Sequence, residues 1–245
     1  RDRWRRARVL CADFEELRFG GDPIPAAVAR AVEDRIGALI APIEDLSAGR
    51  WRSRAIPPGS SWPAIDVQRE ARKYLARTRQ GTYLLKFSGL GRFGERRLRR
   101  ARALAGANLI PEVVGLVHGF LVQRWVEAAP ISTDSINRID RRALVEHVAE
   151  HLAFLVRRFP AGPDEGATPR QLLRMARHNA EAALGAEIAG PLRRFRDELS
   201  RIEGARRVTA TDNRLHAWEW LALPGGHFTK ADAIDHHDAH DLVGC

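Results

Sequence analysis

Lysine is scarce in this chain. Among its 40 basic residues, only Lys73, Lys86 and Lys230 are lysines, and all the others are arginines. A coding bias toward arginine would explain this skew on a solvated surface, where either side chain serves. In a binding site the two differ, because a compact ammonium and a planar guanidinium make different contacts. A lysine kept inside an apolar strand, as Lys86 is, therefore indicates a specific function.

Long apolar runs are also missing. No stretch approaches the roughly 18 apolar residues of a membrane helix, and Arg1 to Arg6 begins no signal peptide. The two cysteines, Cys11 and Cys245, lie far apart, so we expect free thiols rather than a disulfide. We therefore expect a cytoplasmic protein that does not bind membranes, whose oligomeric state the sequence does not indicate.

The net charge of +9 raises the question of nucleic-acid binding. The densest basic segment, Arg92 to Arg102, would spread its arginines around much of a helix, which is typical of a solvated face. We therefore do not expect a nucleic acid as the partner. With 245 residues and 44% apolar content, the chain can form one large domain or two lobes.

Apolar spacing divides the chain into a strand-rich part and a later helix-rich part. The predicted strands are Val9 to Phe14, Thr82 to Phe87, Val113 to Val117 and Phe120 to Val126. The predicted helices are Pro25 to Ile40, Asp66 to Leu75, Glu95 to Ala107, Arg141 to Phe159, Pro169 to Leu184 and Pro191 to Ile202. The last two strands are expected to form a hairpin.

Lys86 stands near the end of a predicted strand. Alternation along Thr82 to Phe87 places it on the face opposite Leu85. From there its ammonium could enter a cleft and hold nucleotide phosphates, with Glu95 orienting it as an ion pair. The alternative is a lysine at a sheet edge whose ammonium reaches solvent.

A glycine motif follows this strand. The segment Gly89 to Gly94 matches G-x-G-x-x-G, stands after a strand and precedes a helix. A dinucleotide-binding unit would continue into a parallel strand that ends near an acidic residue. Here Glu112 precedes the next strand, and that strand begins a hairpin. We therefore favour a flexible glycine turn whose amides could approach a phosphate.

Acidic and imidazole side chains are concentrated near the C-terminus. Seven of them lie between Asp232 and Asp241. Such a density is poorly satisfied in an apolar core and favours a cation site over a merely solvated face. Carboxylates suit magnesium, whereas clustered imidazoles would suit zinc or manganese.

The order of these pieces, a strand lysine, a glutamate-bearing helix, an apolar hairpin, a helical part and two acidic segments, resembles the aminoglycoside-phosphotransferase branch of the protein-kinase-like superfamily. The resemblance covers roughly residues 48 to 245. It implies an α+β, two-lobed protein-kinase-like fold with a small antiparallel-sheet N-lobe and a helical C-lobe. It also implies ATP and Mg²⁺ as cofactors and a small-molecule substrate.

The resemblance divides the chain into three parts. Residues 1–46 form a lead-in segment, 47–127 the N-lobe that holds the nucleotide phosphates, and 128–245 the helical C-lobe with the catalytic and metal loops. We expect further helices of this lobe to follow Cys245.

The cofactor-binding residues follow from the same resemblance. Lys86 would be the phosphate-binding lysine and Glu95 its partner. Gln123, Trp125 and Val126 would belong to the interlobe linker that meets adenine.

The catalytic and metal loops depart from the family pattern. The segment Leu215 to Glu219 resembles the catalytic loop H-G-D-L-H-P-x-N, but Arg214 occupies the position of the catalytic aspartate. The implied catalytic residues are Asp212, Arg214 and His216, with Asp212 as the candidate base. The implied metal ligands are Glu219, Asp232 and Asp235, with Glu219 at the position of the family's asparagine.

Two other functions remain open. A divergent relative could bind nucleotide without transferring phosphate. A metal-dependent phosphohydrolase is the other, because Asp235-His236-His237 spells the motif of the DHH phosphoesterases and His240-Asp241 resembles HD-type sites. Those enzymes need further aspartate motifs on parallel strands, which this sequence lacks, so phosphoryl transfer to a small-molecule hydroxyl is favoured.

Overall fold

The computed structural model describes residues 18–19, 22–56, 58–59, 70–132, 135–160, 168–203, 207–211, 214–234 and 238–242. The chain divides into two compact units. The first takes its described residues from 1–135 and 217–234, and the second from 136–216 and 235–245. The first unit thus includes the expected N-lobe, 47–127, and residues on both sides of it. It also includes 217–234, a segment that the resemblance places in the helical lobe.

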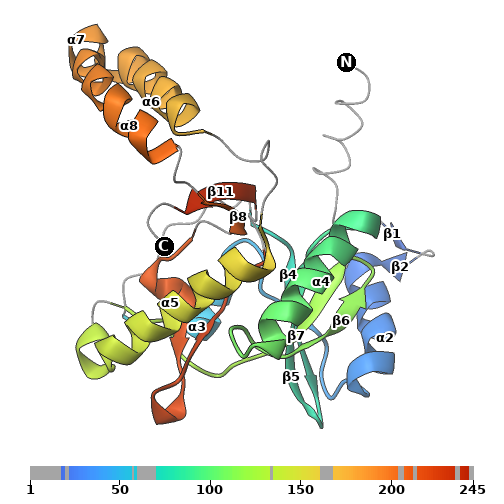
Figure 1. The fold of residues 1–245 in the computed structure, drawn as a ribbon. Helices are drawn as coiled ribbons and strands as arrows, with labels where there is room; N and C mark the ends of the chain where they lie inside the picture. Colours follow the sequence, from blue (N-terminus) through green and yellow to red (C-terminus); the bar gives the residue numbers. More distant parts are fainter. Residues whose placement is uncertain are drawn as a thin grey trace. The chain divides into compact units, whose positions relative to one another are not determined.

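The first unit is built on a five-stranded antiparallel sheet with the strand order β3-β4-β5-β7-β6 (Figure 1). Its strands are β3 (Glu44–Asp45), β4 (Lys73–Thr78), β5 (Gly81–Phe87), β6 (Val113–Val117) and β7 (Phe120–Arg124). The turn between β6 and β7 uses His118 and Gly119, both with positive φ. The predicted hairpin is confirmed, and the antiparallel pairing excludes a dinucleotide-binding βαβ unit here.

One face of the sheet carries the core. Helix α2 (Ile24–Ile36) turns the side chains of Val28, Val32 and Ile36 toward it, because residues four apart share one side of a helix. The sheet supplies Tyr74, Ala76, Tyr83, Leu85, Val117, Phe120 and Val122 to the same cluster. The helix ends at Ile36, four residues earlier than predicted, because the next residue, Gly37, has a φ of 83°, which the α-helix does not allow. Residues 24–45 therefore pack with the sheet rather than leading into it.

The glycine motif forms the entrance to helix α4 (Gly91–Gly106). A Cβ atom on Gly94 would lie 2.1 Å from the carbonyl oxygen of Gly89, so the turn folds back onto the helix with no room for a side chain. The backbone N–H of Ser88 donates to the carbonyl of Gly119 at 2.7 Å, which ties the turn to the β6–β7 hairpin. The described contacts thus give Gly94 a packing function, whereas a Cβ on Gly91 would meet nothing within 4 Å.

The predicted helix from Asp66 to Leu75 is wrong at its C-terminal end. Residues Lys73 to Leu75 belong to strand β4, which pairs with β5 along its whole length. Burial of Tyr74 against the sheet core decides this conformation, because tertiary packing outweighs a local helical pattern. The predicted strand from Val9 to Phe14 lies outside the described residues.

Small elements complete the first unit. The hairpin of β9 (Trp220–Ala222) and β10 (Phe228–Lys230) pairs Trp220 with Lys230. The others are β1 (Arg18–Phe19), β2 (Asp22–Pro23), α3 (Trp51–Ala55), η3 (Ala217–Glu219) and η4 (Pro224–Gly226).

The second unit is mainly helical. Its elements are η1 (Ile136–Arg138), α5 (Arg141–Arg158), α6 (Pro169–Leu184), α7 (Ala186–Ala189), η2 (Gly190–Phe195) and α8 (Arg196–Glu203), with a strand pair of β8 (Arg207–Thr211) and β11 (Asp238–Leu242). Asp140 caps α5, and a capping box of Thr168 and Gln171 begins α6. The last predicted helix is divided into η2 and α8.

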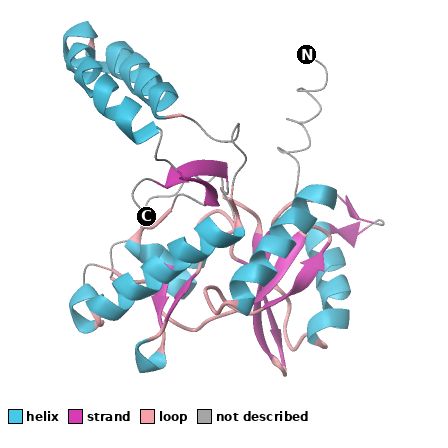
Figure 2. Cartoon of the chain, in the orientation of Figure 1, coloured by secondary structure: helices cyan, strands magenta, loops and turns pink. Residues whose placement is uncertain are grey.

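The predicted α+β class, with an antiparallel sheet in the earlier part and helices in the later part, is confirmed (Figure 2). None of the helices in the described ranges has the length and apolar character needed to cross a membrane.

Candidate functional site

Lys86 projects from the sheet face opposite the α2 core. Its side chain is buried, with 8% of its surface exposed, and its Nζ donates to Oδ1 of Asp232 at 2.8 Å. Asp232 follows strand β10, so 146 residues of chain separate two side chains that form one ion pair within the first unit. A buried ammonium needs such a partner, because its desolvation would otherwise cost several kcal/mol.

Lys73 lies directly opposite Lys86 on the neighbouring strand. Opposed residues of antiparallel strands project from the same face with Cβ atoms about 5 Å apart. Lys73 donates to Oε2 of Glu70 at 2.6 Å and lies 5.7 Å from the ring centroid of Trp51. The sheet therefore presents two ammonium groups side by side.

Lys230 is the third lysine of the same site. It is fully buried, and its Nζ donates to Oε2 of Glu219 at 2.6 Å and to the backbone carbonyl of Asp232. The β9–β10 pairing positions it, since Lys230 stands opposite Trp220, the residue after Glu219. We call Lys73, Lys86 and Lys230 the lysine cluster. It contains every lysine of the chain.

Asp232 is the common electrostatic partner of the lysine cluster. Burial by itself would raise the pKa of this carboxyl. The charge and hydrogen bond of Lys86, together with the charges of Lys230 and Lys73, outweigh burial and hold the pKa well below its usual range. Asp232 is therefore an anion at neutral pH, although about a third of its side chain, 32%, is exposed.

The pKa of Lys73 is lowered from its usual value. Burial is the main cause, and the nearby charge of Lys86 adds to it, while the Glu70 carboxylate and Asp232 act in the opposite direction. A negative charge that arrives near Lys73 would favour its protonated form.

Glu95 lies on the first turns of α4 with its side chain exposed. The ion pair described for Lys86 is with Asp232 instead. The Lys86–Glu95 pair stays a prediction.

The predicted adenine linker begins at the end of β7. Gln123 is buried within the sheet, and the backbone N–H of Trp125 donates to the carbonyl of Thr82 at 2.9 Å. The carbonyl of Val126 accepts from Ala128 at 2.9 Å. The indole Nε1 of Trp125 is buried and finds no hydrogen-bond acceptor within the described part of the chain.

The predicted catalytic loop is described in part. Arg214 and His216 are exposed and belong to the second unit, whereas Glu219 is buried in the first. Asp212 and Asp235 lie outside the described residues. Their catalytic and metal-binding functions therefore stay predictions.

The described residues form no cluster of three or more acidic, histidine or cysteine side chains that could hold a metal ion. The predicted metal ligands differ in their surroundings. Glu219 is engaged by Lys230, whereas Asp232 pairs with Lys86 and keeps part of its carboxylate exposed. His236 and His237 lie outside the described residues, so a histidine-rich site stays a prediction.

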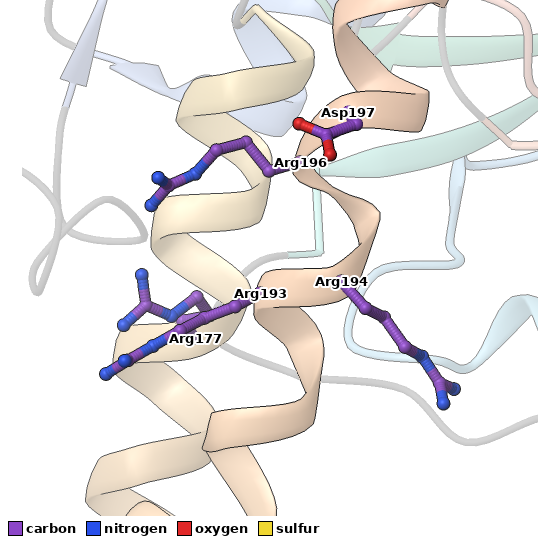
Figure 3. Close-up of a pocket in the computed structure, with 5 residues that line it drawn as sticks. All are labelled: Arg177, Arg193, Arg194, Arg196 and Asp197. Carbon is purple, nitrogen blue, oxygen red and sulfur yellow. The ribbon is translucent and has the colours of Figure 1, made fainter.

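A polar hollow lies on the helices of the second unit. It is lined by Arg177, Arg193, Arg194, Arg196 and Asp197. Figure 3 shows the side chains of Arg193 and Arg196 extending across α6, whereas Arg194 points the other way. The Nε atom of Arg177 is buried without an acceptor among the residues that the structure describes. None of the predicted nucleotide or metal ligands lines this hollow.

Sequence reasoning missed three members of the lysine site: Glu70, Lys73 and Lys230. Lysine scarcity was the available signal, because it applies equally to all three lysines. We applied it to Lys86 alone, since Lys73 fell in a predicted helix and Lys230 had no assigned partner.

Neither a family model nor a curated protein sequence matches this chain. It is similar to the solved structures of choline kinase LicA from Streptococcus pneumoniae (15% identity, 74% of this chain and 63% of that chain, TM-score 0.38) and an ethanolamine kinase from Plasmodium vivax (11%, 78% and 60%, 0.40). It is also similar to a thermostable mutant of aminoglycoside phosphotransferase APH(4)-Ia in complex with ADP and hygromycin B (15%, 88% and 72%, 0.49). The chain thus spans less than two thirds of the first two proteins, and similarity at these levels assigns it no substrate or partner.

Proposed function

We propose that this chain is a kinase-like phosphotransferase that binds ATP at the lysine cluster and transfers its γ-phosphoryl group to a hydroxyl of a small molecule. The observation that carries the proposal is the buried ion pair between Lys86 and Asp232, with the other two lysines of the chain around the same carboxylate.

The site offers ammonium donors for phosphate oxygens. Its three ammonium groups balance three carboxylates, those of Glu70, Asp232 and Glu219, so the Mg²⁺ that arrives with the nucleotide would offset the charge of the triphosphate. Phosphate oxygens would accept hydrogen bonds from Lys86 and Lys73, the two lysines on the sheet face. In such a water-poor setting, fixed cations neutralise phosphate charge far better than they would in water.

Asp232 fits Mg²⁺ that arrives with the nucleotide. Its carboxylate is ionised and partly exposed, and Mg²⁺ prefers carboxylate and phosphate oxygens. When bound there, the ion would neutralise charge on the phosphates. Asp235 is the other candidate ligand from the sequence.

The adenine would lie against the linker of Gln123, Trp125 and Val126. The buried indole N–H of Trp125 supports this assignment, because a buried donor without an acceptor favours a ligand that supplies one.

The transfer step needs a group that receives the acceptor proton. The acceptor hydroxyl oxygen would form a bond to the γ-phosphorus while the bond from that phosphorus to the oxygen of departing ADP breaks. We assign the proton to Asp212. Arg214 and His216 are the other residues that the resemblance implies for this step.

The first prediction concerns ATP binding. Mg-ATP should raise the unfolding temperature of the wild-type chain, and Lys86→Ala should abolish this shift, because the phosphates lose their principal ammonium. Differential scanning fluorimetry measures both. Arg77→Ala is the matched control, since it removes the cation of another ion pair, with Glu44, from the same sheet and should keep the shift.

An assay of ATP consumption with pooled small-molecule acceptors then tests phosphoryl transfer, and the variants Asp212→Asn and Asp235→Asn are expected to be inactive. If the chain binds ATP but does not consume it, the chain is a nucleotide-binding protein and the proposed transferase activity is wrong. A thermal shift that survives Lys86→Ala but disappears in His236→Ala would point to the phosphohydrolase instead.

A further inference from the structure

Lys230 occupies the place where the sequence predicts a metal ion. Its ammonium binds oxygen atoms of the two described residues that were assigned as metal ligands, the carboxylate of Glu219 and the backbone carbonyl of Asp232. The side chain of Lys230 is 0% exposed and that of Glu219 8%. This pair is therefore a built part of the interior and not a surface contact.

The backbone holds this arrangement in place. The N–H of Ala231 donates to the carbonyl of Glu219 at 2.8 Å, and the N–H of Lys230 donates to the carbonyl of Leu109 at 3.1 Å. The Trp220 ring lies 5.9 Å from the ammonium. The segment leading to Asp232 is thus attached to Glu219 through both main chain and side chain.

A divalent ion does not fit Glu219 in these surroundings. A magnesium ion requires oxygen ligands at about 2.1 Å in octahedral geometry and keeps several waters. Here the Glu219 carboxylate is buried, and its charge is already neutralised by Lys230 at hydrogen-bond distance. Binding a metal at Glu219 would require the ammonium to move away from this carboxylate and to give up a charge-assisted hydrogen bond inside the protein.

We propose that the Lys230 ammonium is a built-in cation that replaces a divalent metal ion at Glu219, so that a metal ion can enter this site only through Asp232. The inference rests on the proposed nucleotide site, and it changes the predicted function of Glu219 from a metal ligand to the anchor of Lys230. Lys230 is a positioning residue. Its ammonium donates to the backbone carbonyl of Asp232, whereas Lys86 donates to the side-chain carboxylate.

The test counts bound Mn²⁺, which stands in for Mg²⁺, by electron paramagnetic resonance, with and without a nonhydrolysable ATP analogue. The single variant Glu219→Gln should bind the same number of Mn²⁺ ions as the wild-type chain, with the same affinity, because Glu219 holds no metal. Lys230→Met should gain one Mn²⁺ site, since it leaves the carboxylate without its cation. The double variant, Lys230→Met with Glu219→Gln, should lose that site again.

Two results would overturn the proposal. One is an affinity for Mn²⁺ that falls about tenfold or more in Glu219→Gln, as expected for a metal ligand. The other is a folded Lys230→Met variant without the added site. If Lys230→Met does not fold, Glu219→Gln decides alone, because glutamine still offers Lys230 an acceptor oxygen.

Failure of the proposed function is distinguishable. If the wild-type chain does not bind the ATP analogue, nucleotide binding is wrong. The Mn²⁺ counts on nucleotide-free Lys230→Met and on the double variant still decide whether Lys230 replaces a metal ion.

Discussion

At the scale of single residues, two neighbouring lysines each have a carboxylate partner, but the positive charge of Lys86 disfavours that of Lys73. Lys86 has the Asp232 carboxylate at 2.8 Å, and Lys73 has Glu70 at 2.6 Å, yet the pKa of Lys73 is still lowered because burial and Lys86 disfavour its charge. An arriving phosphate would reverse this, because a nearby negative charge favours the protonated ammonium.

The residue-scale prediction is that ATP binding takes up protons in alkaline solution. Lys73 is partly neutral in the free protein between its lowered pKa and about 10.4, the ordinary value. Bound phosphates raise its pKa, so a fraction of a proton enters per ATP bound in this pH window. Isothermal titration calorimetry in buffers of different ionisation enthalpy measures the uptake.

Lys73→Arg is the control for this prediction. Arginine keeps the positive charge but does not titrate in the window, so the uptake should vanish while ATP still binds. Uptake that persists in Lys73→Arg would assign the proton to another group and contradict the prediction.

At the scale of elements, the glycine turn before α4 shows how close packing can imitate a binding motif. Gly94 stands against the carbonyl of Gly89 with no space for a methyl group, and a Cβ there would also lie 2.9 Å from Leu116. Close packing therefore accounts for the last glycine of the motif, Gly94.

The element-scale prediction compares two identical substitutions in one helix. Gly94→Ala should lower the free energy of unfolding by about 1–3 kcal/mol, because the clash is with backbone that cannot move aside cheaply. Gly106→Ala should leave it unchanged or slightly raised, since nothing lies within 4 Å of that Cβ and alanine favours the helix. Urea unfolding followed by circular dichroism measures both. Equal losses in the two variants would contradict the packing account.

The elements themselves could be predicted unevenly from the sequence. The α6 helix was predicted from Pro169 to Leu184 and has those bounds, because its capping box and its flanking proline and glycine are local signals. Strand β4 was missed in favour of a helix, since its conformation depends on pairing with β5 and on burial of Tyr74. Local signals thus specify the ends of α6, whereas a central strand depends on its pairing and burial.

At the scale of the whole molecule, the chain carries a large excess of positive charge. The net charge is +9, with 40 basic and 31 acidic residues, so like charges repel across the folded surface. The internal ion pairs of the lysine cluster are buried and respond much less to dissolved salt.

The whole-molecule prediction is that salt stabilises the fold. Raising NaCl from about 10 mM to about 150 mM shortens the screening length from about 30 Å to about 8 Å and should raise the unfolding temperature. The variant Arg96→Glu with Arg99→Glu changes two exposed residues of α4 and lowers the net charge from +9 to +5, because each substitution removes one positive and adds one negative charge. Its salt response should be smaller. A wild-type unfolding temperature that falls with salt would contradict this.

A binding measurement with generic RNA or DNA distinguishes a solvated arginine surface from a nucleic-acid site. Tight binding that weakens steeply with salt would support the nucleic-acid function that the net charge raised.

The sequence by itself determined the α+β class and the division into a strand-rich and a helix-rich part. These follow from local spacing, which requires no knowledge of distant contacts. Lys86 stands out because lysine is rare in this chain and this one lies inside an apolar strand, which indicates a specific function that stays a prediction.

Only the tertiary structure decided that Lys86 has Asp232 as a partner. Sequence order points to Glu95, nine residues away, and that pair stays a prediction. The chain returns through the β9–β10 hairpin and brings Asp232 to Lys86, a partner that no local pattern indicates. It also brings Lys73 and Lys230 to the same carboxylate and fills the Glu219 position with an ammonium. These contacts depend on strand register and on the path of the chain between distant strands. Packing of the whole unit determines both, so no local pattern predicts them.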